Sequence, residues 1–252
     1  MNRRLVRTGV VFLGACAIAL AGRPTAAQTG TNRSFFSFNG GYQTPSRKFA
    51  DIATFRLHAE DGAAESRYEV TPGPTLDVHG GVRVWRGLAL GMGVTTYNRS
   101  GAASVSGQLP HPFFFGRPRT VTGSATDLKH EQVAVHIQAL WLAPVGRAFT
   151  LAVFGGPSVF RVTQELVSSL EGDENYPFDT ATLRSIQTER QRDTKIGFHA
   201  GVDVAYFFSS HVGTGVLVRF SRAKVDVPTG DADGLSIDAG GAEVAAGVRL
   251  RF

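Results

Sequence analysis

The sequence predicts an all-β fold: an eight-stranded antiparallel up-and-down transmembrane β-barrel, preceded by a cleavable signal peptide. Three observations predict it. Eight segments alternate apolar residues with polar or small ones over about the length that a tilted strand needs to cross a bilayer. The connections between these segments are alternately short turns and long polar stretches. The N-terminal segment has the composition of a secretory signal.

The N-terminal segment has the three parts of an export signal in the usual order. Arginines precede an apolar run over residues 9–22, and small residues end at Ala27. We therefore expect residues 1–27 to be removed and residues 28–252 to form one barrel domain. The apolar run is too short for a membrane-spanning helix, which needs roughly 20 residues.

Cys16 is the only cysteine of the chain and lies within the predicted signal. The barrel domain is therefore expected to have no disulfide and no cysteine-based metal site. Residues 13–16 also resemble the lipid-attachment box of bacterial lipoproteins, so lipidation of Cys16 stays open as an alternative. The same segment carries four arginines and no acidic residue, which account for most of the formal net charge of +5. The sequence pI of 9.7 thus gives no reason to expect nucleic-acid binding.

Five predicted strands lie in the first part of the domain. In 36–42, aromatic residues and glycine alternate with Ser, Asn and Gln. Segments 75–85 and 88–97 alternate Leu, Val and Met with polar or small residues on either side of an Arg-Gly turn, which predicts a hairpin. Segments 133–142 and 149–162 are joined by a short turn that contains proline and glycine.

Three further strands complete the set. Segments 198–206 and 212–220 form a second hairpin of the same pattern, and 242–252 has the clearest alternation, with no charge on its apolar face. One irregularity is expected in the fifth strand. Gly155-Gly156-Pro157 interrupts it, and a closed barrel has no free edge for a residue without an N–H group, so we expect a bulge or an early exit from the membrane there.

The alternation alone fits two inverse arrangements. A membrane barrel exposes its apolar phase to lipid, whereas a soluble lipocalin-like barrel buries that phase inside. Glycines share the charged phase in several strands, for example Gly91, Gly93, Gly213 and Gly215. They would leave room in a narrow lumen for long inward side chains, which favours the membrane barrel.

The inward phase of the membrane barrel carries acids and bases together. Because an eight-stranded barrel has room inside only for side chains, we expect these groups to pair and fill the lumen. A metal site formed by His79, His136 and His199 and a proton or solute path are the alternatives. The predicted interior polar network consists of Asp77, His79, Arg83, His136, Gln138, His199, Asp203, Arg219, Glu243, Arg249 and Arg251.

Long polar connections over 44–70, 98–130, 164–193 and 225–236 are expected to be external loops, which places both chain ends in the periplasm. The sequence leaves open whether the stretches around Tyr68 and Val105 add strand beyond the membrane, and so whether the strand count is eight or ten. One loop joins apolar and basic residues and could contact lipopolysaccharide through acyl chains and phosphates; alternatively, its phenylalanines cap the barrel mouth. Its candidate contact residues are His111, Phe113, Phe114, Phe115, Arg117 and Arg119.

The last strand resembles the terminal strand of bacterial outer-membrane proteins, in which a final phenylalanine follows alternating apolar residues. The matching residues are Val244, Ala246, Val248, Leu250 and Phe252. This resemblance implies recognition by the barrel-assembly machinery. Together with the export signal and the eight strands, the domain resembles the small outer-membrane barrel superfamily that includes opacity proteins and the membrane domain of outer membrane protein A. The resemblance implies a Gram-negative cell envelope and names no ligand.

The expected function is non-enzymatic: a structural or surface-interaction role through the external loops. A narrow conduit for small or hydrophobic solutes is the alternative, and a lipid-acting enzyme is a third. Ser100, Ser104, Ser106 and His111 share one external stretch, but no nucleophile motif surrounds them. We expect no cofactor, a monomer, and outer-membrane lipid and lipopolysaccharide as partners.

Overall fold

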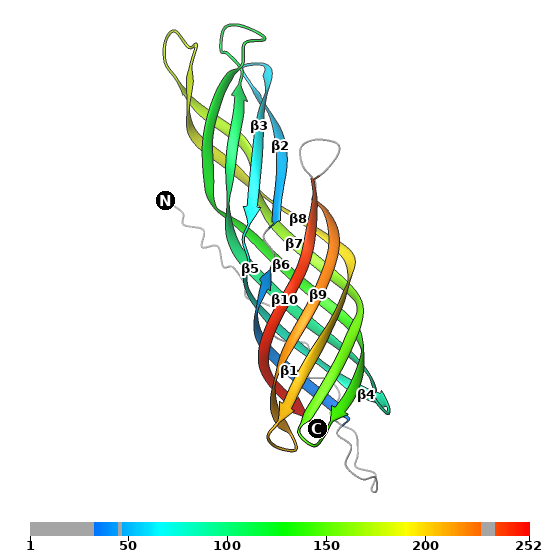
Figure 1. Ribbon diagram of the computed structural model, residues 1–252. Coiled ribbons are helices and arrows are strands. Elements are labelled where there is room, and N and C mark those ends of the chain that lie inside the picture. Colours follow the sequence, from blue (N-terminus) through cyan, green and yellow to red (C-terminus); the bar gives the residue numbers. More distant parts are fainter. Residues whose placement is uncertain (1–32, 45–46, 228–234) are drawn as a thin grey trace, which may run out of the picture. The chain divides into compact units, whose positions relative to one another are not determined.

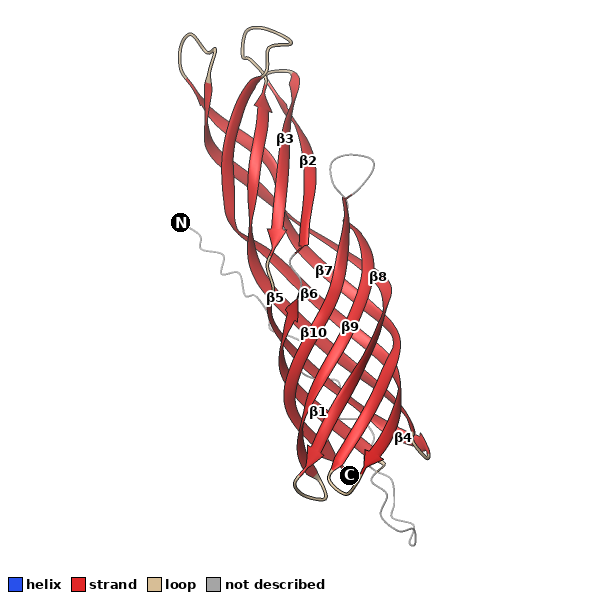
Figure 2. Ribbon diagram, in the orientation of Figure 1, coloured by secondary structure: helices blue, strands red, loops and turns tan. Residues whose placement is uncertain are grey.

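The computed structural model describes residues 33–44, 47–227 and 235–252, so the predicted signal peptide and Cys16 lie outside the described residues. The described part contains ten strands and no helix. Figures 1 and 2 show how the strands are arranged. The strands are β1 (Ser34–Thr44), β2 (Arg47–Leu57), β3 (Glu60–Val70), β4 (Gly73–Trp85), β5 (Leu88–Leu109), β6 (Arg119–Val145), β7 (Phe149–Glu174), β8 (Ala181–Phe207), β9 (Val212–Val227) and β10 (Leu235–Arg251).

Eight of these strands form a closed antiparallel ring in the order β1-β4-β5-β6-β7-β8-β9-β10, and β10 pairs back to β1. Each of the eight segments with alternating residues falls within one strand of this ring, which confirms the predicted fold class. Two backbone hydrogen bonds between Ser34 and Phe252, of 3.1 and 2.8 Å, join the ends of the first and last strands. Closure pairs the backbone groups that an open edge would leave exposed to lipid.

The remaining strands, β2 and β3, correct the prediction that residues 44–70 form a loop. They make a hairpin, and β3 pairs with the distal half of β5 from Glu69↔Ala102 to Ala63↔Gln108. The other long connections are also largely strand: β5 and β6 stay paired to Leu109↔Arg119, and β7 and β8 to Glu174↔Ala181. Long strands therefore continue well beyond the expected membrane-crossing length.

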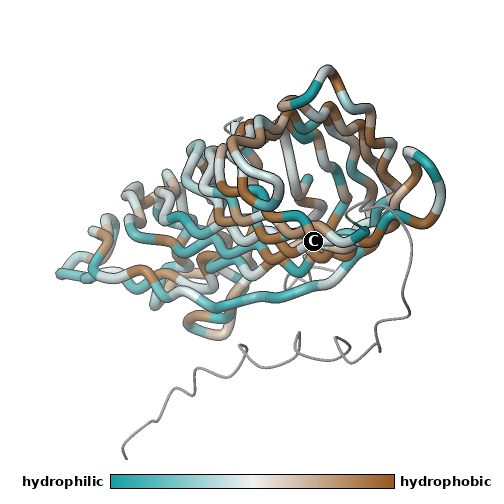
Figure 3. The backbone as a smooth tube through the Cα atoms, turned by 90° about the horizontal axis from the view of Figure 1, so that it is seen from below, coloured by the Kyte–Doolittle hydropathy of each residue, from teal (hydrophilic) through white to brown (hydrophobic). Residues whose placement is uncertain are grey.

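Strand β5 shows why this extension looked like loop. The buried phase consists of odd-numbered residues in both halves of the strand, but polar and apolar residues exchange faces between the two halves. In the proximal half, Leu90 and Met92 are exposed on the outside. In the distal half, Ser104 is exposed, while Val105 and Leu109 are buried. The proximal half is thus built for lipid and the distal half for water around an apolar core; Figure 3 shows apolar and polar residues alternating along the ring.

Strand β6 keeps its inward phase through an irregularity. The β5–β6 register shifts between Gly101 and Ala103, and opposite them Asp127 adopts φ 60°. Strand β6 has one extra residue at this bulge. Its inward-facing residues therefore have odd numbers before the bulge, such as Val121, and even numbers after it, such as His130. Without this bulge, the distal half of β6 would turn its apolar residues to water.

The ring opens above His130↔Gln164, the last pair that joins β6 to β7. Beyond it, the sheet β2-β3-β5-β6 lies against the β7–β8 hairpin, and leucines of one layer fit over glycines of the other. A Cβ atom on Gly107 would lie 2.1 Å from the side chain of Leu170, and one on Gly123 would lie 2.2 Å from Leu183. The extension is therefore a two-layer sandwich, which we call the stalk.

The prediction of a bulge or an early exit from the membrane at Gly155-Gly156-Pro157 is wrong. The β6–β7 register is the same before and after this site, at His136↔Ser158 and Ala139↔Gly155, and β7 continues without a break. Two ladder positions are simply skipped at Gly156 and Pro157. Glycine makes this possible, because a Cβ atom at Gly156 would lie 2.1 Å from the carbonyl oxygen of Ile137.

Candidate functional site

Asp77, in the middle of β4, is the centre of the hydrogen-bond network inside the barrel. It is fully buried and accepts hydrogen bonds from several directions. One carboxylate oxygen is 2.8 Å from the Asn39 amide nitrogen and 2.8 Å from His79 Nδ1. The other accepts from Thr95 Oγ1 at 2.9 Å and from the Arg219 guanidinium. A carboxylate buried in this way is stable only with such partners.

Two arginines extend the network to both sides of Asp77. Arg219 Nε lies 3.5 Å from a carboxylate oxygen of Glu243, whose other oxygen accepts from Thr75 at 2.9 Å. Arg249 forms a bidentate pair with Asp203, at 2.9 and 2.6 Å. All four charged groups are buried or nearly so. Bidentate geometry fixes both side chains in place as well as pairing their charges.

Two of the three histidines considered as metal ligands meet at a serine. Ser158 Oγ lies 2.8 Å from Nδ1 of both His136 and His199, and the ring centroids of the two histidines are 4.6 Å apart. His79 is instead engaged by Asp77. The described residues contain no group of three His, Cys, Asp or Glu side chains that could hold a metal ion. These histidines thus serve the network inside the barrel.

The structure places the predicted interior residues in two groups. Arg83 and Arg251 are only half-buried and lie near the end of the barrel where the chain terminates; Arg251 donates to the Ser210 carbonyl oxygen at 2.8 Å. The nine buried ones are Asp77, His79, His136, Gln138, His199, Asp203, Arg219, Glu243 and Arg249. Sequence reasoning missed four further uncharged residues that share the inward phase: Asn39, Thr75, Thr95 and Ser158.

Apolar clusters lie on both sides of this network. On the side of the chain end, Leu140, Phe154 and Leu217 pack together. On the side of the stalk, a larger core includes Phe160, Val162 and many residues of the two layers. The described part of the lumen is thus filled by side chains at three successive levels.

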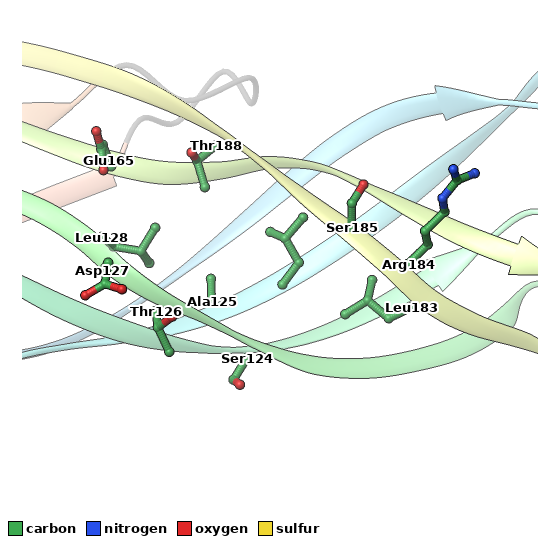
Figure 4. Close-up of a pocket in the computed structure, with 11 residues that line it drawn as sticks. Ser124, Ala125, Thr126, Asp127, Leu128, Glu165, Leu183, Arg184, Ser185 and Thr188 are labelled. Atoms are coloured by element: carbon green, nitrogen blue, oxygen red, sulfur yellow. The ribbon is translucent and has the colours of Figure 1, made fainter.

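A pocket, here called the side opening, lies between β6 and β8 where β6 and β7 separate (Figure 4). Its volume is about 480 Å³, and its walls are residues 124–128 of β6, Glu165 of β7 and residues of β8 from Leu183 to Thr188. A hydrogen bond from the Lys129 backbone N–H, together with Arg190, holds the pKa of Glu165 below its usual range. The lining of the side opening is mixed, with polar residues such as Thr126 and Ser185 and apolar residues such as Leu128 and Leu183.

The loop between β5 and β6 is held by groups that we had expected to contact ligand. His111 is buried, and its Nδ1 accepts from the backbone N–H groups of Phe113 and Phe114 at 3.1 and 3.2 Å. Arg119 is also buried and donates to the Pro110 carbonyl oxygen at 2.6 Å. Both residues hold the loop in shape, which leaves the phenylalanines and Arg117 as its exposed groups.

Arg119 also ties this loop to the β7–β8 turn. It donates to the Phe178 carbonyl oxygen at 3.2 Å and pairs with Glu174, which also contacts His58 of the β2–β3 turn at 3.3 Å. Burial alone would raise the pKa of Glu174, but the hydrogen bond and charge of Arg119 outweigh it and hold that pKa below its usual range. Three turns therefore meet at one ionic clamp at the far end of the stalk.

The outer surface of the ring is an apolar belt with aromatic residues at the edge near the chain end. Near the chain end, the rings of Phe149 and Tyr206 contact each other at a tilt of 50° with centroids 5.0 Å apart, and Trp85 and Trp141 are exposed. Aromatic side chains at the two edges of an apolar band mark the membrane interfaces. Exposed members of the belt include Phe36, Phe38, Leu76, Val82, Leu90, Met92, Val94, Val135, Ile137, Val153, Val204, Val216, Val218, Val244 and Val248.

The closed ring, the apolar belt and the polar lumen define the class: a transmembrane β-barrel of the outer membrane. A lipocalin-like barrel has the inverse arrangement, with its apolar residues inside and its polar residues outside. The residues of the proposed assembly signal contribute to the belt, with Val244, Val248 and Phe252 exposed and Leu250 half-buried. No helix in the described residues is long and apolar enough to cross a membrane.

Comparisons with known proteins return barrels of this class among solved structures. Neisserial surface protein A is 14% identical, with 86% of this chain and 97% of that chain covered and a TM-score of 0.44. OprG from Pseudomonas aeruginosa is 10% identical, with 88% and 98% covered and a TM-score of 0.46. The outer membrane protease OmpT from Escherichia coli is 9% identical, with 89% and 99% covered and a TM-score of 0.46.

No protein-family profile and no curated protein matches the sequence. The structural matches have low identity and TM-scores under 0.5, and they include a surface protein and a protease. They therefore carry no inference about function. The assignment to the class rests on the ring and the belt of the chain itself.

Proposed function

We propose that the protein is a non-enzymatic outer-membrane barrel that makes surface contacts through the end of its stalk. The observation that carries this proposal is the ionic clamp, which holds exposed aromatic residues on a rigid two-layer extension. In this proposal both chain ends are periplasmic and the stalk is external. The belt contacts outer-membrane lipid, and the barrel acts as a monomeric anchor.

The polar network supports an anchor rather than a channel. Its charges are paired over short distances and enclosed between two apolar clusters. An open water path would require these pairs to separate, and truncation of one partner of a buried pair usually costs about 3–5 kcal/mol.

The absence of enzymatic activity is also part of the proposal. Ser100, Ser104 and Ser106 are exposed on the outer face of β5, whereas His111 is buried with its Nδ1 occupied by backbone N–H groups. Ser158 contacts two histidines, but it is almost fully buried within the barrel. None of these serines combines an available base with access for a substrate.

The side opening between β6 and β8 favours the second candidate, a narrow conduit that releases solute sideways. Planar-bilayer recording with the full chain separates the two candidates. We expect no conductance steps, and we expect expressing cells to adhere to cultured animal cells or to cells of their own strain. Replacement of residues 112–117 by a Gly-Ser stretch should abolish this adhesion. Steady conductance would favour the conduit, and adhesion that survives the replacement would contradict surface contact through the end of the stalk.

The orientation is tested with single cysteines, because the domain after residue 27 contains none. Phe115→Cys, at the far end of the stalk, should react with a membrane-impermeant maleimide on intact cells. Ser210→Cys, an exposed residue in the turn between β8 and β9, is the matched control and should react only after the outer membrane is permeabilised. Labelling of the two variants in the opposite order would place the stalk in the periplasm.

A further inference from the structure

We propose that the end of the stalk docks onto a second lipid bilayer, other than the membrane in which the barrel is anchored. The docking surface, here called the aromatic tip, consists of Phe113, Phe114, Phe115, Tyr176 and Arg117. In this proposal the aromatic rings enter the boundary between headgroups and acyl chains, and Arg117 binds lipid phosphate. The inference rests on the proposed surface-contact function and names its partner.

The aromatic tip exposes large apolar side chains to solvent. The relative exposures are 68%, 54% and 77% for Phe113, Phe114 and Phe115, and 88% for Tyr176. The loops that carry them are adjacent, because Phe113 packs edge-on against Phe178 with ring centroids 5.2 Å apart. Clustered exposed aromatic residues of this kind mark an interaction surface.

The tip is held in this exposed form. His111 fixes the backbone before Phe114, the Gly116 N–H donates to Glu60 at 2.9 Å, and Arg119 joins the two loops. These contacts come from three different strand pairs. These contacts therefore prevent the phenylalanines from folding back onto the stalk. Binding of a partner then costs little further conformational entropy of the loop.

A lipid surface fits the shape of the tip better than a protein pocket does. Three consecutive phenylalanines at a convex turn are each more than half exposed, so a single rigid pocket could not enclose them all, whereas a fluid bilayer can. Arg117 lies over the Phe114 ring at 5.4 Å and has no ion pair among the described residues. Aromatic rings beside an unpaired cation are typical of groups that lie at a membrane interface.

The length of the stalk excludes the acyl chains of the anchoring membrane. Val94 is the last outward apolar residue of the belt on β5, and the strand continues to Leu109. These fifteen steps span roughly 50 Å along the strand, or about 35 Å above the membrane even at a tilt of about 45°. The bilayer that the aromatic tip reaches must therefore belong to another membrane.

Flotation with lipid vesicles tests this inference. The full chain, reconstituted in nanodiscs, is mixed with vesicles of phosphatidylcholine alone or with added phosphatidylserine. Wild-type nanodiscs should float with the vesicles, and more strongly with the anionic ones. The triple variant Phe113→Ser, Phe114→Ser, Phe115→Ser should lose more than about a hundredfold in vesicle affinity. Arg117→Gln should lose its preference for anionic vesicles only.

Two controls make the result specific. Replacing the same three phenylalanines by leucine keeps the apolar area but changes its shape, so lipid binding should persist within a few-fold. Heat-modifiable gel mobility confirms that each variant is folded. Wild-type nanodiscs that do not float would overturn the lipid partner. If adhesion of expressing cells still depends on the phenylalanines, the surface-contact function stands with a different partner; if adhesion is also independent of them, both proposals fail.

Discussion

Gly247→Ala is expected to prevent closure of the barrel. Gly247 lies on β10 in the seam that joins the last strand to the first, opposite Asn39. A Cβ atom there would lie 1.9 Å from the carbonyl oxygen of Phe38 and 2.7 Å from the Asn39 Cα atom. Both are backbone atoms of β1, so relief requires the two strands to separate. We expect the heat-modifiable folded band to disappear, or its free energy of unfolding to fall by more than about 3 kcal/mol.

Gly40→Ala is the matched control for this prediction. Gly40 lies in the same seam, one position along, where it pairs with Ala246. A Cβ atom at Gly40 would meet nothing within 4 Å. This variant should fold normally, because the added methyl group points into open space on the lipid side. Equal effects of the two substitutions would show that glycine is needed in the seam for flexibility and not for close approach of the strands.

The ring was predictable from the sequence because its signal is local. In a closed barrel of this class, each strand alternates by itself, so segments such as 242–252 identify themselves without knowledge of their neighbours. The same rule hid the stalk. At Ser104 and Val105 the alternation continues but the polar residues face outward, and a polar composition does not distinguish such a strand from a loop. The polarity of the two faces, rather than the alternation, distinguishes a lipid-facing strand from a water-facing one.

The network inside the barrel was predictable by residue but not by partner. The inward phase identified Asp77 and Arg219, which are far apart in sequence, yet their pairing depends on the stagger of all the strands between them. The loop that carries the phenylalanines was recognised from its composition. That His111 and Arg119 would be buried could not be seen, because their partners come from other turns or from the local backbone.

Asp77→Ala is expected to be the most destabilising substitution within the lumen. It leaves the buried Arg219 guanidinium without its closest carboxylate, and it removes an acceptor from Asn39, His79 and Thr95. Removing one partner of a buried ion pair typically costs about 3–5 kcal/mol, because the remaining charge is still desolvated. Urea unfolding of the barrel in lipid vesicles, followed by gel mobility, measures the loss.

Two further variants separate the buried charge from the simple loss of a carboxylate. Asp173→Ala removes an acid that lies 3.7 Å from Arg184 in an exposed pair, and it should change the free energy of unfolding by less than about 1 kcal/mol. The double variant Asp77→Leu, Arg219→Leu should recover only part of the loss. No unpaired guanidinium remains inside, but Glu243 loses its Arg219 partner and keeps the hydrogen bond from Thr75. The single variants Asp77→Leu and Arg219→Leu complete the cycle. If the double variant loses as much free energy of unfolding as the two single variants lose together, the two side chains act independently, and the network is a set of separate contacts.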